Sequence, residues 1–382
     1  MITREQVRFI AEQVAPHTGP VLSLYADVDP AKPENSRKGW LLRAKNTLKG
    51  MPLPAALARR VTGLLEEERP RARTLVVFAG DDLLVRHDLQ VELPVVDLAH
   101  GRVEARWGEP YVAPLVYALD EYERAGVLLL EQKGWRFFEI YLGEIEEATE
   151  AFSAMAATEW GDLKDYLPTV YADFLKQRLP THPDRFPKRL EAWVHRFLKR
   201  LAATIEQVLA ERGINRLVLM GPPELTHFFE QFLSLSARRR VVAHLGGPPH
   251  PGASAAQVLE RVALTLETAE REHELQLLEE IRNRSGIWGL DPTLDALQLG
   301  RLSLLVAPWD IEAVVWRCPA GWVGGSKDEA QLLCPEEEPW ETPLRDVIVD
   351  LAAGFGARLE FVRGEAQTRL NEEFGGLAGM LR

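Results

Sequence analysis

Short apolar segments alternate with long amphipathic ones, and this alternation most constrains the fold. Residues 126–130 read Gly-Val-Leu-Leu-Leu and residues 216–220 read Arg-Leu-Val-Leu-Met, each the length of a buried strand. Between them, residues 188–212 carry apolar side chains at helical spacing, and Gly213 follows where a helix would end. A strand–helix–strand alternation of this kind predicts a mixed α/β layer architecture.

The same periodicities predict further elements on both sides of this segment. Strands are expected at residues 21–25, 74–78, 135–142, 240–245, 302–307, 313–317 and 358–362, with a hairpin or edge strand within 83–93. Helices are expected at residues 3–14, 40–48, 115–122, 224–235, 254–284, 292–299 and 343–354. The closing residues 374–382 are short and rich in glycine.

Composition narrows the class of protein. The 382 residues carry a net charge of −12, which argues against indiscriminate binding of nucleic acid but leaves room for a local basic face. No apolar run reaches the length of a membrane span, and the first residues lack the pattern of a secretory signal. We therefore expect a globular protein of the cytoplasm, and we expect no cofactor.

The two cysteines each begin half of a metal knuckle. Cys318-Pro319-Ala320-Gly321 and Cys334-Pro335-Glu336-Glu337 both lack the second thiol of a C-x-x-C pair, whereas a structural zinc ion needs four ligands. The spacing predicts a degenerate knuckle without metal. A disulfide between the two is open if the knuckle geometry persists, but the reducing cytosol disfavours it.

The order of several motifs resembles the bacterial branch of the archaeo-eukaryotic peptide chain release factors and Pelota. The motifs are Val21-Leu22-Ser23-Leu24-Tyr25, Glu109-Pro110-Tyr111-Val112-Ala113-Pro114-Leu115, Leu219-Met220-Gly221-Pro222-Pro223, Ala296-Leu297-Gln298-Leu299-Gly300-Arg301-Leu302, the paired Cys-Pro segments and the closing Gly375-Gly376-Leu377-Ala378-Gly379-Met380-Leu381-Arg382. Together they cover essentially the whole chain.

The resemblance implies three domains. Residues 1–108 would form a domain that faces the decoding site, and residues 109–275 an RNase H-like middle domain. Residues 276–382 would resemble the kink-turn-binding ribosomal proteins, with the degenerate knuckle inserted at about 316–342.

The family's catalytic Gly-Gly-Gln loop is not found in this sequence. It would lie between residues 150 and 188, where Gly161 is the one glycine, and none of the Gly-Gly pairs elsewhere precedes a glutamine. The glycines of such a loop let a backbone N–H approach the tRNA end, and the glutamine places water. Gln177 is the weak candidate that remains, so we expect a binding protein rather than a peptidyl-tRNA hydrolase.

Basic side chains crowd two stretches of this acidic chain and are candidate RNA contacts through phosphate groups. The first stretch contains Lys32, Arg37, Lys38, Arg43, Lys45 and Lys49, and the second contains Lys176, Arg178, Arg185, Lys188, Arg189, Arg196, Lys199 and Arg200. Of these, the candidates singled out are Lys38, Arg43, Lys45, Lys176, Arg178, Arg185, Lys188 and Arg189. A solvated helix face is the competing interpretation, especially from Lys188 onward. Asp27, Asp29, Asp81 and Asp82 are interpreted as turn residues that bond the local backbone.

Three functions stay open at this point. The leading hypothesis is a release-factor-like protein that enters the ribosomal A site and acts in rescue, hibernation or quality control without hydrolysis. The alternatives are a peptide chain release factor with a divergent loop, and a stand-alone protein that binds structured RNA. The resemblance implies a monomer, with rRNA as a partner and a translational GTPase such as elongation factor Tu as a further candidate.

Overall fold

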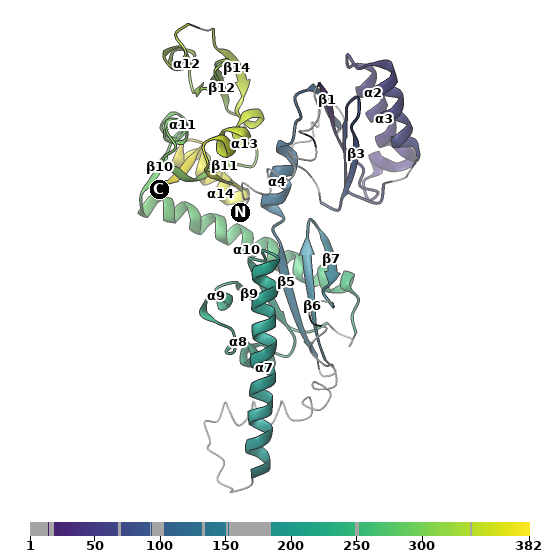
Figure 1. Cartoon of the computed structure of the whole chain (residues 1–382), viewed down its shortest axis with the longest axis vertical. Helices are drawn as coiled ribbons and strands as arrows, with labels where there is room; N and C mark the ends of the chain where they lie inside the picture. The colour runs from purple at the N-terminus through teal and green to yellow at the C-terminus, as the bar shows by residue number, and fades with distance from the viewer. Residues whose placement is uncertain are drawn as a thin grey trace. The chain divides into compact units, whose positions relative to one another are not determined.

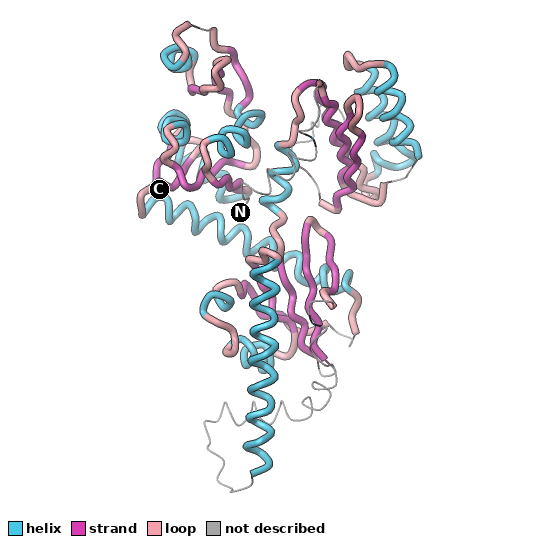
Figure 2. The backbone as a smooth tube through the Cα atoms, in the orientation of Figure 1, coloured by secondary structure: helices cyan, strands magenta, loops and turns pink. Residues whose placement is uncertain are grey.

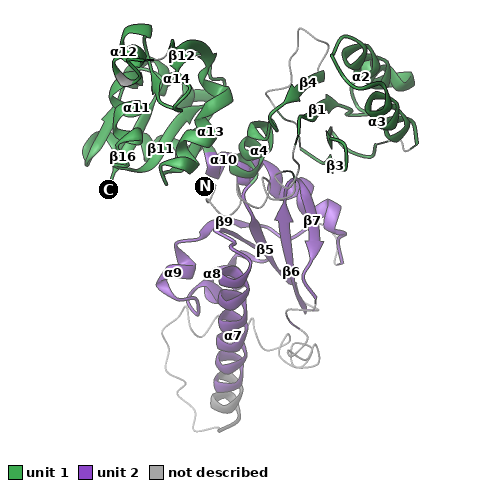
Figure 3. Ribbon diagram, turned by 45° about the horizontal axis from the view of Figure 1, so that its top comes forward, with its two compact units in different colours: residues 1–122, 271–382 green, residues 123–270 purple. Residues whose placement is uncertain are grey.

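The computed structural model describes residues 14, 19–67, 70–91, 93, 103–131, 134–149, 152, 185–248, 252–336 and 338–382, with side chains for all of these except 185–191 and 333. The chain forms two compact units, one of residues 1–122 and 271–382 and one of residues 123–270 (Figure 3). Helices and strands occur in both (Figure 2), so the predicted mixed α/β class is confirmed. The three-domain boundaries stay a prediction.

The first unit opens with an antiparallel sheet in the order β3-β2-β1-β4. Its strands are β1 (Val21–Asp27), β2 (Thr74–Ala79), β3 (Leu84–Leu89) and β4 (Val103–Gly108). A 3₁₀ segment, η1 (Pro33–Lys38), follows β1 and leads into α2 (Gly39–Lys49), which is followed by α3 (Ala55–Glu67). Both helices lie on one face of the sheet (Figure 1), because alternate strand residues such as Leu22, Leu24, Leu75 and Val77 form one apolar core with them.

The later part of the same unit contains a sheet in the order β10-β16-β11-β15, in which β11 and β15 pair in parallel. Its strands are β10 (Gly286–Trp288), β11 (Leu302–Pro308), β15 (Arg358–Val362) and β16 (Ala378–Leu381). The last turns of α10 (Ala255–Asn283) and helix α14 (Gly364–Phe374) share one apolar core with these strands. Helices α11 (Leu290–Gln298) and α13 (Leu344–Gly354) contact the sheet as well. The closing residues thus enter the interior of the sheet, which the sequence did not predict.

The knuckle segment forms a small sheet of its own, in the order β13-β12-β14. It consists of β12 (Val314–Arg317), β13 (Val323–Gly324), β14 (Trp340–Pro343) and α12 (Lys327–Leu333). Gln298 fastens it to α11, because its side-chain amide donates to the Val323 carbonyl and accepts from the Val323 N–H, both at 2.7 Å.

The structure contains the disulfide that the sequence left open. Cys318 and Cys334 form a disulfide, with their Cα atoms 6.3 Å apart and a sequence separation of 16. Both side chains are buried. The knuckle turns bring the two thiols within disulfide geometry even without a metal. Since the thiols bond each other and no group of three metal-ligating side chains occurs among the described residues, the site does not fit zinc.

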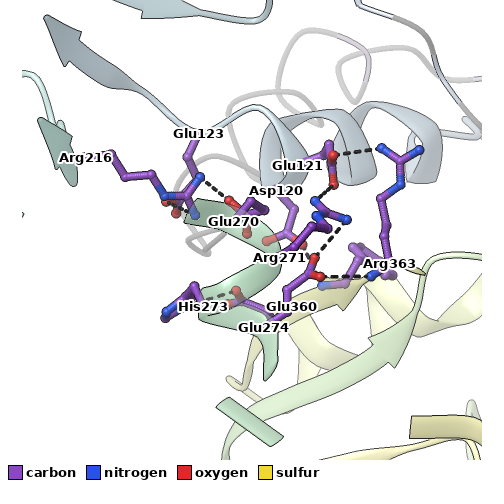
Figure 4. A network of polar contacts seen from close by, with 11 residues as sticks. Asp120, Glu121, Glu123, Arg216, Glu270, Arg271, His273, Glu274, Glu360 and Arg363 are labelled. Atoms are coloured by element: carbon purple, nitrogen blue, oxygen red, sulfur yellow. Dashed lines mark hydrogen bonds and ion pairs between the residues drawn. The ribbon is translucent and has the colours of Figure 1, made fainter. Parts of the chain in front are cut away.

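Helix α4 (Ala113–Glu121) is fixed within the first unit by aromatic and charged contacts to β15. Tyr117 stacks on Phe361 with ring centroids 3.7 Å apart, and the Asp120 carboxylate accepts the backbone N–H of Phe361 at 2.6 Å. Glu121 pairs with both Arg271 and Arg363 at 2.7 Å (Figure 4). Strand β15 is at the edge of its sheet, so the Asp120 carboxylate satisfies the Phe361 N–H, which would otherwise be left without a strand partner.

The second unit contains one sheet in the order β7-β6-β5-β8-β9. Strands β5 (Ala125–Glu131), β6 (Gly134–Tyr141) and β7 (Glu144–Glu147) are antiparallel, and β8 (Arg216–Met220) and β9 (Val241–Leu245) run parallel to β5. Helix α7 (Arg185–Glu211) covers one face through the predicted apolar stripe, and the first turns of α10 cover the other. The RNase H-like description of this domain rests on the resemblance alone.

The helix expected over residues 224–235 is two helices, α8 (Pro223–Glu230) and α9 (Leu235–Arg238). Ser234 interrupts it, because its hydroxyl accepts the Ala237 N–H as an N-cap. The Arg238 guanidinium donates to the carbonyls of Glu230, at the end of α8, and of Leu233, in the turn that follows. No helix in the described part of the chain is long and apolar enough to cross a membrane.

Candidate nucleic-acid interface

The loop after β1 is organised around two buried polar side chains, Asp27 and Asn35, each 5% exposed. The Asn35 amide donates to Asp27 Oδ1 at 2.9 Å and to the Asp29 carbonyl at 3.0 Å. Asp27 also accepts the Asp29 N–H at 3.1 Å and the Lys32 ammonium at 2.7 Å. Asp29 in turn accepts the Ala31 N–H at 2.8 Å. The interpretation of Asp27 and Asp29 as turn residues is therefore confirmed.

These contacts set the protonation of Asp27. Burial by itself raises the pKa of the carboxyl group, but the hydrogen bonds from Lys32, the Asp29 N–H and Asn35 outweigh it, and the pKa lies below its ordinary value. The carboxylate is therefore charged near neutral pH, which keeps all of its hydrogen-bond acceptors available to the loop.

Arg43 belongs to this loop framework. From α2 its guanidinium donates to the Glu34 carbonyl at 2.8 Å and to the Asn35 side-chain oxygen. Lys45 pairs with Glu66 of α3, and the Lys45 hydrogen bond lowers the pKa of Glu66. Of the first predicted cluster, these two cations therefore have partners within the protein.

Arg37 and Lys38 differ from them in backbone and in exposure. Both have left-handed backbone angles, φ 51° and 64°, although neither is glycine, and both side chains are exposed. The chain folds back so tightly that a Cβ added to Gly39 would lie 2.2 Å from the Glu34 carbonyl oxygen. We call Arg37–Lys38 the basic turn; the sequence placed Lys38 among the candidate contacts, but it gave no sign of the backbone conformation.

The second predicted cluster is described in part. Lys176, Gln177 and Arg178 lie outside the described residues, and so do the side chains of Arg185, Lys188 and Arg189, whose backbone lies in the first turns of α7. Further along α7, Arg196, Lys199 and Arg200 are exposed on the side opposite the apolar stripe, where Val194, Phe197 and Leu198 are buried. His195 packs edge-on against Phe228 and Phe232, which is a structural role.

The exposed face of α7 and the basic turn differ in how they could bind a polyanion. The face of α7 offers flexible side chains on a regular helix, the usual arrangement of a solvated surface. The basic turn offers two adjacent cations on a backbone that buried hydrogen bonds hold in place. Contacts of such cations to phosphate oxygens add affinity for a nucleic acid but do not depend on its base sequence.

Comparisons with known proteins bear on the middle of the chain. Residues 110–267 match the family described as bacterial archaeo-eukaryotic release factor family 10. No curated protein matches the sequence.

Solved structures show weak likeness over most of the chain. Pelota of Archaeoglobus fulgidus is 14% identical over 81% of this chain and 79% of that chain, with a TM-score of 0.33. Dom34 of S. cerevisiae, described as a translation termination-like factor that interacts with Hbs1, is 9% identical over 100% and 93%, with a TM-score of 0.39. Archaeal Pelota in a ribosome-bound model with ABCE1 is 13% identical over 100% and 94%, with a TM-score of 0.41. These scores are too low to support an argument, so the family match stands by itself.

The matched segment begins before α4 and contains the whole sheet of the second unit together with α7 and the first turns of α10. It includes two of the motifs on which the resemblance was based, Pro110–Leu115 and Leu219–Pro223. The match to a family of bacterial archaeo-eukaryotic release factors confirms the predicted resemblance over residues 110–267.

Proposed function

We propose that this protein is a cytoplasmic factor that binds the ribosomal A site and acts in rescue, hibernation or quality control, without hydrolysing peptidyl-tRNA. The family match over residues 110–267 supports a ribosome-associated role in termination, rescue or quality control. The observation that carries the finer proposal is in the sequence, where Gly246-Gly247, Gly324-Gly325 and Gly375-Gly376 are each followed by a residue other than glutamine.

Within this proposal the basic turn and the second basic cluster contact rRNA phosphates. Arg37 and Lys38 both belong to the first basic stretch, and both side chains are exposed on a fixed backbone. Arg43 then acts within the protein, since its guanidinium already bonds Glu34 and Asn35. Lys176, Arg178, Arg185, Lys188 and Arg189 retain their place as proposed contacts of the middle segment.

Cosedimentation with bacterial ribosomes tests the proposal. The wild-type chain is expected to pellet with ribosomes in growing, stressed or stationary cells, and absence from the pellet under all three conditions would refute it. An Arg37→Ala/Lys38→Ala variant should pellet less. Arg284→Ala is the control, because Arg284 is an exposed cation far along the chain from the basic turn, directly after α10, and pairs with Glu280 of that helix.

The second candidate, a peptidyl-tRNA hydrolase, is separated by a release assay on ribosomes that carry peptidyl-tRNA in the P site. The proposal expects no release above the rate without protein. Release that Gln177→Ala abolishes would favour the hydrolase instead, and release that Gln177→Ala leaves intact would exclude Gln177 from it.

Two further partners are distinguished by the same preparations. A stand-alone RNA-binding protein would bind naked rRNA as tightly as ribosomes, with a steep loss of affinity as salt rises. A delivery GTPase such as elongation factor Tu would raise the fraction bound to ribosomes in the presence of GTP. We propose that the protein binds as a monomer.

A further inference from the structure

The basic turn is held from both ends, and one side chain connects the two anchors. On one side Asp27 ends β1, and its position is fixed by pairing with Thr74 of β2. On the other side Arg43 lies in α2, which is packed into the core by Trp40, Leu41 and Ala44. Asn35 bonds both, donating to the Asp27 carboxylate and accepting from the Arg43 guanidinium.

Every polar group of the Asn35 side chain is used in this arrangement. Its amide nitrogen donates to Asp27 Oδ1 and to the Asp29 carbonyl, and its oxygen accepts from Arg43. Because Asn35 is 5% exposed, losing these bonds would leave buried groups without partners. A left-handed backbone is unfavourable for residues other than glycine. It persists only where contacts with the surrounding structure hold the backbone in that conformation. Arg37 and Lys38 lie directly between the two anchors, so their backbone depends on Asn35.

We infer that Asn35 is a positioning residue, which holds Arg37 and Lys38 at a fixed spacing for the phosphodiester backbone of a structured RNA. This inference rests on the proposed function and deepens it. Arg43 is the second positioning residue, acting through Asn35 and the Glu34 carbonyl. The recognition involves charge and spacing rather than base edges, and it is therefore independent of the RNA sequence.

Positioning and charge make different predictions for salt dependence. Replacing Arg37 or Lys38 by alanine removes one phosphate contact, so the slope of log affinity against log salt should become shallower by roughly 0.7–0.9 per residue. Asn35→Ala keeps every cation but releases the turn, so affinity should fall about tenfold at every salt concentration with the slope unchanged, because ordering the two side chains on binding is unfavourable.

The experiment measures binding of the full chain to purified ribosomes over a range of salt concentrations, together with amide hydrogen exchange of the free protein. In Asn35→Ala, exchange at residues 36–39 should accelerate while β1 and β2 stay protected. Arg43→Lys keeps the charge but cannot reach both acceptors, and it should give the same parallel loss of affinity. This second variant decides the matter if Asn35→Ala fails to fold.

The outcomes separate this inference from the proposed function. If the wild-type chain does not bind ribosomes, the proposed function fails and the inference falls with it. If the wild-type chain binds, but Asn35→Ala and Arg43→Lys bind equally well or change the slope, the inference alone is overturned. Faster exchange at residues 36–39 in Asn35→Ala without any loss of affinity also overturns it. In that case Asn35 would order the turn, but the order would not matter for binding.

Discussion

Reduction of the Cys318–Cys334 disulfide should destabilise the knuckle segment selectively. The segment between β12 and β14 buries few apolar side chains of its own, chiefly Val315, Val323 and Ala330 with the two cysteines. A unit of this size usually needs a cross-link or a metal ion to stay folded. The disulfide is therefore expected to supply a large share of the local stability.

The magnitude follows from the size of the loop that the bond closes. With 16 residues of sequence separation, the chain-entropy model gives about 3 kcal/mol at 25 °C. If opening of the segment is local, this corresponds to an increase of about two orders of magnitude in amide exchange, since each 1.4 kcal/mol is tenfold. The effect should be confined to residues 314–343.

Hydrogen exchange with mass spectrometry, on oxidised protein and on protein reduced and held in reductant, measures this change. Cys318→Ser/Cys334→Ser should exchange like the reduced protein in either condition, and peptides from β5 and β8 serve as an internal reference. A zinc chelator should leave exchange unaltered, and metal analysis should find less than one zinc per chain. Equal protection of residues 314–343 in the oxidised and reduced forms would refute the reasoning, as would loss of protection on chelation.

Three further perturbations test the fold around the proposed sites. The pKa of Asp27 lies below its ordinary value, so its contribution to stability is present above about pH 4 and is lost as pH falls through the folded pKa; a urea titration should show this loss, and Asp27→Asn should abolish it. Gln298→Ala removes both bonds to the Val323 backbone and should cost about 2–4 kcal/mol in local opening, measured by exchange in β13. Gly221→Ala should lower the free energy of unfolding by about 1–3 kcal/mol or more, since φ is 149° there and a Cβ would lie 2.4 Å from the Leu130 carbonyl; thermal melting unchanged from wild type would contradict this.

The elements that the sequence predicted well are those whose residues repeat a single period. The strands beginning at Val21, Thr74 and Leu302 and the helix ending near Arg212 all carry long apolar patterns, and the structure places each within a few residues. Such patterns are reliable because they express which face of an element is buried, and burial is what stabilises the element.

The sequence did not predict strand β16, because its residues are chosen for close packing against the neighbouring strand β11 and do not show the alternation of a typical strand. A Cβ at Gly379 would lie 2.9 Å from the Leu304 carbonyl oxygen and from a Leu302 methyl group. The strand therefore needs glycine where a typical strand would have a β-branched residue. A glycine-rich segment then has the composition of a loop although it lies between two other strands.

The candidate site shows a different limit. Sequence identified a basic stretch from Lys32 to Lys49, but it did not show which cations bond within the protein. Arg43 and Lys45 have internal partners, whereas the exposed pair is Arg37 and Lys38. That distinction depends on Asn35, an uncharged residue that no charge pattern would single out. Charge patterns therefore locate such a surface, and buried hydrogen bonds decide which of its residues are presented.

The knuckle segment shows that a knuckle-like backbone does not by itself imply a bound zinc ion. A zinc knuckle would need a second thiol at position 321, where Gly321 has φ 90° and its N–H closes the turn onto the Cys318 carbonyl at 2.8 Å. A cysteine there would be strained in this backbone, so restoring a ligand would disturb the turn that holds the first thiol. The disulfide and the glycine turn are thus mutually consistent as a cross-link without metal. In the same way, the proposed contact of the basic turn with an RNA backbone needs only position and charge, whereas release would require a Gly-Gly-Gln loop that the sequence does not contain.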